Sequence, residues 1–217
     1  MDTYKETVGF FAMIITMMQM LAGTLICKDI YKKGTTEGTD SMPFIGATAV
    51  CTLMLRYALM LNDSAMINVN IFGLITSIIY MLVFYYYAPD TEKLFKQMIK
   101  VAGFVVIFLA YAEVESSEKI EYRFGMLVTI LLLLLIASPL VHLREVIETK
   151  NADILPIPII VSGTLVSFMW LWYGYIIDNT FLVFQNVIGL SLNVVQLSLF
   201  AMYGSKKSQD GLSSKQD

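Results

Sequence analysis

Long apolar segments recur along the whole chain, separated by short polar stretches. A predominantly apolar segment of about 20 residues is long enough to cross a bilayer as an α-helix. The pattern therefore predicts an all-α, polytopic membrane protein. Its seven expected spans are Val8–Cys27, Met42–Leu61, Met66–Ala88, Val101–Ala112, Phe124–His142, Ile154–Ile177 and Phe181–Tyr203.

Two of these segments carry a polar stripe. In the third, Asn70, Gly73 and Ser77 stand at i, i+3 and i+7, which is one face of an α-helix. The seventh repeats the pattern with Asn186, Gly189, Asn193 and Gln196. Two such helices facing one another would line a polar path through lipid.

The fourth segment has the weakest pattern, with 12 strictly uncharged residues. The distribution of Lys and Arg supports its existence, because cytoplasmic loops of membrane proteins are enriched in these residues. With the N-terminus outside and seven spans, the cytosolic side holds Lys28, Lys32, Lys33, Lys93, Lys96, Lys100, Arg144, Lys150, Lys206, Lys207 and Lys215. The outer side then holds only Lys5, Lys119 and Arg123. We therefore expect an external N-terminus and a cytosolic C-terminus.

The chain contains an internal repeat. Tyr57, Asn70 and Gly73 recur 116 residues later as Tyr173, Asn186 and Gly189. A single linking span gives both halves the same orientation, so a pseudo-twofold axis along the membrane normal is expected. We expect a first three-helix repeat over 7–89, a linker with the fourth helix over 90–122, a second repeat over 123–204 and a disordered cytosolic tail over 205–217.

Composition excludes several classes of function. The chain is 57% hydrophobic and 15% charged, with a mean hydropathy of +0.67, which argues against a soluble enzyme. The sequence has no Ser/His/Asp set, no metal-ligand cluster, no glycine-rich phosphate loop and no basic-aromatic patch for nucleic acid. We therefore expect no catalytic residue, no cofactor and no metal. Cys27 and Cys51 lie in apolar segments and are interpreted as packing residues.

An ordered set of motifs in both halves carries a family resemblance. It comprises Thr36-Glu37, Pro43, Tyr57, Asn70, Tyr86-Tyr87-Ala88-Pro89, Ala137-Ser138-Pro139-Leu140, Lys150 to Pro156, Trp170, Trp172-Tyr173-Gly174, Gln185-Asn186, Gly189 and Gln196-Leu197. Over roughly residues 8 to 204 the chain resembles the SWEET family of sugar transporters. The resemblance implies two parallel three-helix bundles joined by a linker helix, the 3+1+3 plan.

The resemblance also implies roles for individual residues. The asparagine pair of the family's third and seventh helices falls at Asn70 and Asn186, and its outer closure at Tyr57 and Tyr173 with Asp178 or Asn179. The four helix prolines of its inner gate fall at Gly23, Pro43, Pro139 and Pro156. Gly23 departs from the proline pattern, although glycine also weakens a helix, by about 1 kcal/mol relative to alanine.

The chemistry of these residues suits a sugar. An asparagine side chain has a carbonyl acceptor and two amide donors, so one asparagine on each side can bind sugar hydroxyls without introducing charge. Trp170 offers a stacking face, and pocket width would depend on residues such as Met54 and Val187. Each reading has a structural alternative: interhelical hydrogen bonding for the asparagines, ordinary packing for Trp170, an interfacial belt for the tyrosines and helix starts for Pro43 and Pro156.

Two functions follow as hypotheses. The first is a facilitative, bidirectional sugar transporter, a uniporter for mono- or disaccharides that works by alternating access. The alternative is a proton-coupled amino-acid exporter or cargo receptor of the PQ-loop group, although Pro43 and Pro156 are followed by Phe44 and Ile157, not by glutamine. Arg56 is a charge inside a span, and both a functional role and snorkelling to the interface are open. We expect residence in the plasma membrane or an internal membrane such as the Golgi, and homo-oligomers by analogy with the family.

Overall fold

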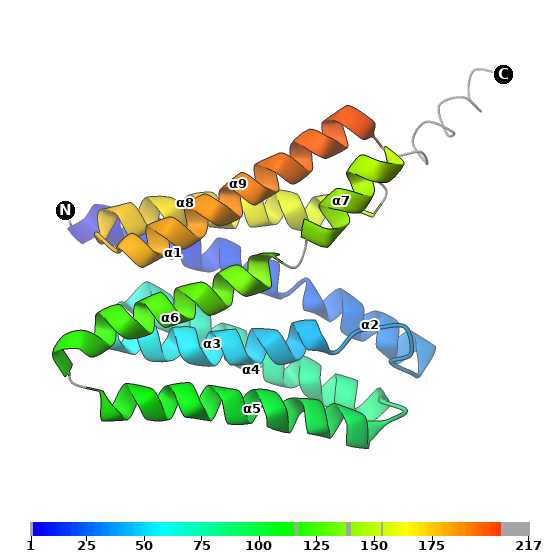
Figure 1. Ribbon diagram of the computed structural model, residues 1–217, viewed down its shortest axis with the longest axis horizontal. Coiled ribbons are helices and arrows are strands. Elements are labelled where there is room, and N and C mark those ends of the chain that lie inside the picture. Colours follow the sequence, from blue (N-terminus) through cyan, green and yellow to red (C-terminus); the bar gives the residue numbers. More distant parts are fainter. Residues whose placement is uncertain (1, 116, 138–139, 153, 205–217) are drawn as a thin grey trace. The chain divides into compact units, whose positions relative to one another are not determined.

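The structure is a computed structural model that describes residues 2–115, 117–137, 140–152 and 154–204. These residues form nine α-helices and no β-strand, which confirms the predicted all-α class (Figure 1). The helices are α1 (Asp2–Met20), α2 (Gly23–Lys33), α3 (Met42–Leu61), α4 (Ser64–Tyr87), α5 (Thr91–Val114), α6 (Ser117–Ala137), α7 (Leu140–Thr149), α8 (Ile157–Ile176) and α9 (Thr180–Tyr203).

Six segments of the described chain are helical, long and apolar enough to cross a membrane: Thr3–Lys33, Met42–Leu61, Ser64–Tyr87, Thr91–Val114, Ile157–Ile176 and Thr180–Tyr203. The expected fifth span, Phe124–His142, covers the end of α6 and the beginning of α7, and residues 138–139 between these helices lie outside the described residues. The expected tail over 205–217 also lies outside the described residues. The six long apolar helical segments show that the chain is a multi-pass membrane protein.

The fourth span is a full-length helix. It has 24 residues instead of the 12 that hydropathy alone indicates, so it extends over about 36 Å. Asp90 caps its N-terminus by accepting a hydrogen bond from the Lys93 amide at 2.9 Å. Charged side chains in the first turns of α5 interrupt the apolar pattern of the sequence, but these turns belong to the same helix.

The first span is not one continuous helix. α1 ends at Met20 and α2 begins at Gly23, inside the expected Val8–Cys27. Across the break the Thr24 amide donates to the Leu21 carbonyl at 3.0 Å, a bond to the third preceding residue. In an uninterrupted α-helix it would donate to Met20. No proline is needed to interrupt the helix at this point.

The helices form two compact units. The N-terminal unit is Gly9–Val128, which contains α2 to α5 with most of α1 and the beginning of α6. The C-terminal unit is Met1–Val8 together with Thr129–Asp217, which contains α7 to α9. These are packing units, and the repeat boundaries expected from the sequence stay a prediction.

The packing inside the two units repeats. In the N-terminal unit α4 packs on α3 and α2, and in the C-terminal unit α9 packs on α8 and α7. Each unit has a cluster of buried hydrophobic side chains. Ile30 and Phe44 belong to the cluster of the N-terminal unit, and Val146 and Ile160, each 116 residues later, belong to that of the C-terminal unit. The repeat predicted from Tyr57, Asn70 and Gly73 is thus also a repeat of contacts.

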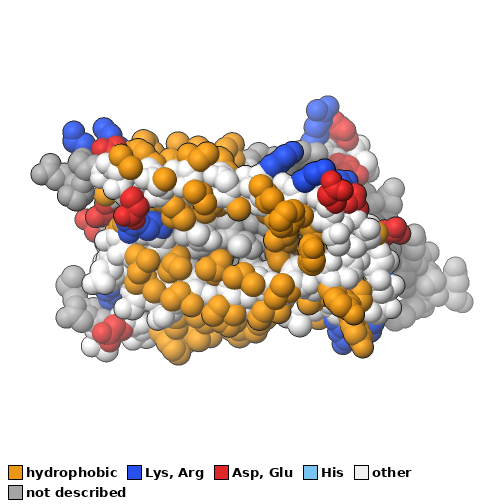
Figure 2. All heavy atoms as spheres, turned by 90° about the horizontal axis from the view of Figure 1, so that it is seen from below, with side chains coloured by type: hydrophobic (Ala, Val, Ile, Leu, Met, Phe, Trp, Pro, Cys, Tyr) orange, Lys and Arg blue, Asp and Glu red, His pale blue; other side chains and the backbone are white. Residues whose placement is uncertain are grey.

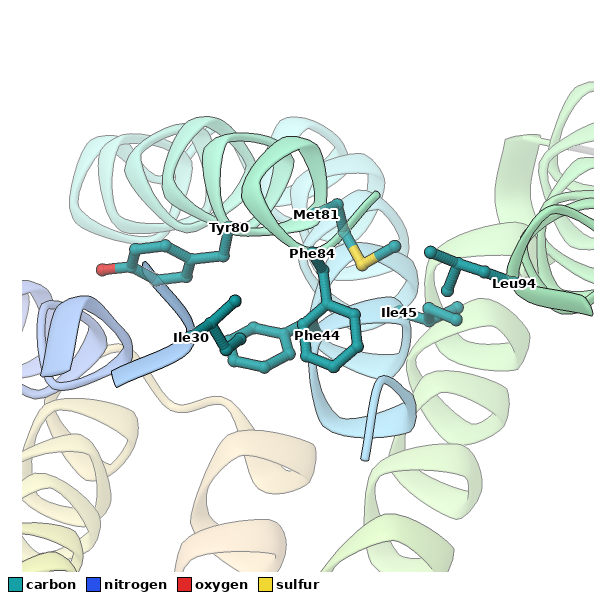
Figure 3. Close-up of a cluster of buried hydrophobic side chains, with 7 residues drawn as sticks. All are labelled: Ile30, Phe44, Ile45, Tyr80, Met81, Phe84 and Leu94. Atoms are coloured by element: carbon teal, nitrogen blue, oxygen red, sulfur yellow. The ribbon is translucent and has the colours of Figure 1, made fainter. Parts of the chain in front are cut away.

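Hydrophobic side chains cover the exterior of the helices. On the face shown in Figure 2 they occupy the middle of the helices, and charged side chains gather toward the helix ends. Leu82 on α4 and Ile107 on α5 are 64% and 66% exposed. Long apolar helices that expose many large apolar side chains are expected to face lipid. One buried cluster lies where α2, α3, α4 and α5 meet, and Figure 3 shows Phe44 and Phe84 packed together within it.

Candidate functional site

The polar stripe of α4 lies on the buried face of the helix. Asn70 is 7% exposed and Ser77 5% exposed. Gly73 lies between them against α3, where a Cβ on the glycine would be 2.7 Å from the Cys51 sulfur. Glycine is therefore what lets α4 approach α3 at this level. The Asn70 Nδ2 donates a hydrogen bond of 2.7 Å to the Met66 carbonyl.

The C-terminal unit holds the equivalent arrangement on α9. The Asn186 Nδ2 donates to the Leu182 carbonyl at 2.8 Å, and Leu182 stands 116 residues after Met66. Asn186 is half-buried. Gly189 lies against α8, where an added Cβ would be 3.2 Å from the Ser167 hydroxyl. Ser167 is the repeat equivalent of Cys51, so the two asparagines occupy equivalent positions within their own units.

This geometry fixes how each amide points. A carbonyl only accepts hydrogen bonds, so the atom that faces Met66 O or Leu182 O must be the amide nitrogen. The Oδ1 atom points the other way, and within the described residues it makes no hydrogen bond in either asparagine. Each helix therefore presents a held amide with an open acceptor and a second donor hydrogen.

Met54 and Trp170 occupy equivalent positions on α3 and α8, 116 residues apart. Trp170 is 7% exposed, and its ring packs edge to face on Tyr173 with centroids 5.6 Å apart. Met54 is half-buried. Tyr57 and Tyr173 are each 2% exposed, so both lie deeper than a tyrosine belt at a lipid interface requires.

Two tight turns of identical design join α3 to α4 and α8 to α9. Asn62 and Asp178 have φ angles of 50° and 54°, a left-handed conformation in which asparagine and aspartate are enriched. The next residues, Asp63 and Asn179, accept hydrogen bonds from Met66 N and Leu182 N and cap the following helices. Asp178 is exposed at the turn, and Asn179 is buried beneath it.

The four predicted gate positions differ in their surroundings. Gly23 is the first residue of α2, directly at the break in the first span. Pro43 lies in the first turn of α3, and Pro156 caps α8. Neither interrupts a helix, so any role of these two prolines is that of a rigid helix start and not of a mid-helix hinge. Pro139 lies outside the described residues.

Arg56 is part of a charged network at the ends of three helices. Its guanidinium on α3 lies 2.9 Å from the Glu113 carboxylate on α5. Glu115, which ends α5, binds Arg123 on α6 and accepts from the Tyr111 hydroxyl at 2.9 Å. The hydrogen bonds from Arg123 to Glu115 and Tyr111 raise the pKa of Arg123. Arg56 on α3 is thus paired with the linker helix α5, and a role in transport stays a prediction.

The comparison with known families is decisive. The chain matches the MtN3_slv family, described as "Sugar efflux transporter for intercellular exchange", over residues 6–92 and again over 122–208. It is also 31% identical over 201 residues to the sugar transporter SWEET1 of Drosophila pseudoobscura pseudoobscura, covering 91% of this chain and 89% of that protein. The chain belongs to the SWEET family.

Other SWEET proteins extend the match. The bidirectional sugar transporter SWEET10 of Arabidopsis thaliana is 30% identical over 201 residues, covering 90% of this chain and 69% of that protein. The structure also superposes on the 3.7 Å structure of a eukaryotic SWEET transporter with a TM-score of 0.79 at 26% identity, covering 93% of this chain and 97% of the other. The chain therefore has the 3+1+3 plan of a SWEET protein and belongs to a family of transporters, not enzymes.

The structure also brings in residues that the sequence reasoning missed. Tyr80 on α4 bonds across the break between α1 and α2. It could have been found, because it continues the stripe of Asn70, Gly73 and Ser77 by one more turn and precedes Gln196 by 116 residues. Gln185 on α9 donates to the Thr129 hydroxyl on α6 at 2.6 Å. Nothing in the apolar pattern indicates that pair.

Proposed function

We propose that this protein is a facilitative, bidirectional sugar transporter, a uniporter that moves mono- or disaccharides across a membrane by alternating access. Family membership supports sugar as the substrate class, since its relatives in fly and Arabidopsis are named sugar transporters. The observation that carries the proposal is the pair of equivalently held amides, Asn70 and Asn186. A repeat that reproduces the same polar anchor is expected of a carrier.

The amides suit a neutral, hydroxylated substrate. Each is fixed by its bond to the preceding turn, so little side-chain entropy is lost when the sugar binds. The open Oδ1 accepts from a sugar hydroxyl and the second amide hydrogen donates to one. We assign Trp170 as the stacking face and Met54, its repeat equivalent, as the smaller apolar contact. The unequal pair would make the binding site asymmetric.

The lack of Asp, Glu and His in the middle of the expected spans supports uniport. No Asp, Glu or His stands in the middle of any expected span in the sequence. Proton-coupled carriers rely on such intramembrane carboxylates or imidazoles as relays. The gradient of the sugar alone would then drive net transport, and the direction would follow the gradient.

Gating is assigned to the two ends of the helices. We propose that Gly23, Pro43, Pro139 and Pro156 form the inner gate and that Tyr57, Tyr173 and Asp178 form the outer closure. The excess of Lys and Arg on one side supports an external N-terminus and a cytosolic C-terminus. Plasma membrane residence and homo-oligomers remain expectations from the family.

The test is flux in liposomes that contain the purified protein. Uptake of radiolabelled glucose, sucrose and trehalose is measured from either side, with and without a proton gradient. We expect gradient-independent flux of at least one sugar in both directions. Asn70→Ala and Asn186→Ala should each lower it roughly tenfold or more, as expected when hydrogen bonds to the substrate are lost.

Asn68→Ala is the matched control, because Asn68 is exposed on the same helix two residues before Asn70. It should transport at the wild-type rate. Flux that requires the proton gradient, or flux of amino acids in place of sugars, would overturn uniport and favour the exporter of the PQ-loop group. Equal losses in Asn68→Ala and Asn70→Ala would remove the binding role of Asn70.

A further inference from the structure

The break between α1 and α2 is held by a side chain from another helix. The ring of Tyr80 on α4 lies against Gly23, so closely that a Cβ on the glycine would be 2.5 Å from the ring carbon Cε2. No real Cβ is found at such a distance, so any larger residue at position 23 would displace the ring. Figure 3 shows Tyr80 extending from α4 toward the blue ribbon of α2.

The Tyr80 hydroxyl completes the hydrogen bonds of the broken helix. Because the Thr24 amide donates to Leu21, the Met20 carbonyl lacks its usual helical donor. The Tyr80 hydroxyl donates to this carbonyl at 3.1 Å. A tyrosine hydroxyl has one hydrogen, so in its 3.0 Å contact with Thr24 the threonine hydroxyl must be the donor. Tyr80 thus bonds to both sides of the break.

Tyr80 also contacts the residue next to the second gate position of the same half, Pro43. Its ring packs edge to face on Phe44, which follows Pro43, with centroids 5.8 Å apart. The ring therefore lies between the beginning of α2 and the beginning of α3. At the repeat equivalents the sequence has Pro139 and Gln196 in place of Gly23 and Tyr80. The two halves therefore differ at this gate position: the half that has glycine in place of proline there also has the tyrosine.

We propose that Tyr80 is a positioning residue of the inner gate, which holds the α1–α2 break in its bent form and sets how readily α2 leaves the cluster of Ile30, Phe44 and Phe84. This inference rests on the proposed function for its meaning in transport. It concerns a residue that does not bind the sugar. The contact it describes is nevertheless measurable without any sugar.

Cys27 provides a native reporter on α2. It stands one turn after Gly23 and is half-buried against the same cluster. The second cysteine, Cys51, is removed as Cys51→Ser, which introduces the residue found at its repeat equivalent, Ser167. The rate at which a small maleimide modifies Cys27 in liposomes then reports how often α2 leaves the cluster.

In this background Tyr80→Phe keeps the ring on Gly23 and removes only the hydroxyl. We expect Cys27 labelling to accelerate roughly threefold or more, because the variant loses both hydrogen bonds of the hydroxyl and the net loss of even one corresponds to about that factor. Thr24→Val removes one of the two bonds and should accelerate it less, which keeps the test decisive if Tyr80→Phe fails to fold. Tyr86→Phe, at an 80% exposed tyrosine of the same helix, is the control and should label at the starting rate.

Gly23→Ala displaces the ring and should also accelerate labelling. Its combination with Tyr80→Phe should label no faster than the faster single variant, because both act on one contact. In sugar flux, Tyr80→Phe should change the maximal rate and leave the half-saturating concentration unchanged. The proposal would be overturned if Cys27 in Tyr80→Phe were labelled at the starting rate. It would also be overturned if the accelerations of the two single variants multiplied in the double variant. Accelerated labelling in a protein that moves no sugar would support the role of Tyr80 at the break and would overturn the proposed uniporter function instead.

Discussion

Gly73 on α4 lies against Cys51 on α3, with 2.7 Å between the sulfur and the position of an added Cβ. The equivalent pair, Gly189 and Ser167, leaves 3.2 Å. The two halves thus share a packing design but differ in tolerance. Sulfur is larger than oxygen, and Met20 closes the first site further at 2.9 Å.

We predict that Gly73→Ala destabilises the protein more than Gly189→Ala. Overpacking costs about 1–3 kcal/mol, whereas alanine gains about 1 kcal/mol of helix propensity over glycine. The first term should dominate at position 73, and the two should nearly cancel at position 189. Thermal unfolding in detergent measures both. Cys51→Ala should rescue Gly73→Ala in part, and equal melting temperatures for the two glycine variants would contradict the packing argument.

The helix caps after the two tight turns give a second prediction. Asp63→Ala and Asn179→Ala should each lower stability by about 0.5–2 kcal/mol, because each removes the acceptor for an amide at the beginning of α4 or α9. The exchanges Asp63→Asn and Asn179→Asp keep a side-chain oxygen and should be much milder. The comparison is again thermal unfolding, and exchanges as damaging as the alanine variants would exclude the capping role.

Hydropathy predicted the elements that lipid alone determines. The second span, Met42–Leu61, matches α3 residue for residue, and the seventh begins one residue late. It failed where a helix does not coincide with its apolar part. α5 begins at Thr91, ten residues before the expected span, because its first turns project charged side chains. α8 begins at Ile157, three residues after the expected start, because Pro156 caps it.

The sequence indicated which residues form the polar face of α4 but not their geometry. The stripe of Asn70 and Gly73 indicated a polar face, and the structure places that face in the packed interior of its unit. The sequence could not show that each amide bonds its own helix, since that depends on a side-chain rotamer. The sequence could not show the break at Gly23 either, because it depends on Tyr80, 57 residues away, whose hydroxyl donates to the Met20 carbonyl.

The charged network around the linker helix gives a third prediction. Glu113→Gln should lower stability by only about 0.2–1 kcal/mol, because the carboxylate is 72% exposed and exposed pairs contribute little. Glu115→Gln should lower the melting temperature more, because Glu115 is 17% exposed and binds both Arg123 and Tyr111. Raising the salt concentration should reduce the stability difference between Glu113→Gln and the wild type, because salt screens exposed charges. A larger effect at Glu113 than at Glu115 would contradict this ranking.

The pair of Gln185 and Thr129 gives the last prediction, and it concerns an asymmetry between the halves. Gln185 is 3% exposed and Thr129 4% exposed. At the repeat equivalents the chain has Val69 and Met13, so the first half has apolar residues where the second has a hydrogen bond of 2.6 Å. Removing one partner of a buried bond costs about 1–3 kcal/mol, because the polar group that remains loses this bond and stays out of water. We therefore expect Gln185→Val and Thr129→Val to lower the melting temperature separately.

The double variant separates a hydrogen bond from simple packing. Replacing both partners by apolar groups of similar shape is close to neutral, so Gln185→Val with Thr129→Val should recover most of the loss of either single variant. Strict additivity of the two losses would show that each side chain contributes by its own packing. Recovery would instead mean that the bond between α6 and α9 adds little net stability and that the C-terminal unit folds nearly as well around an apolar pair at these two positions.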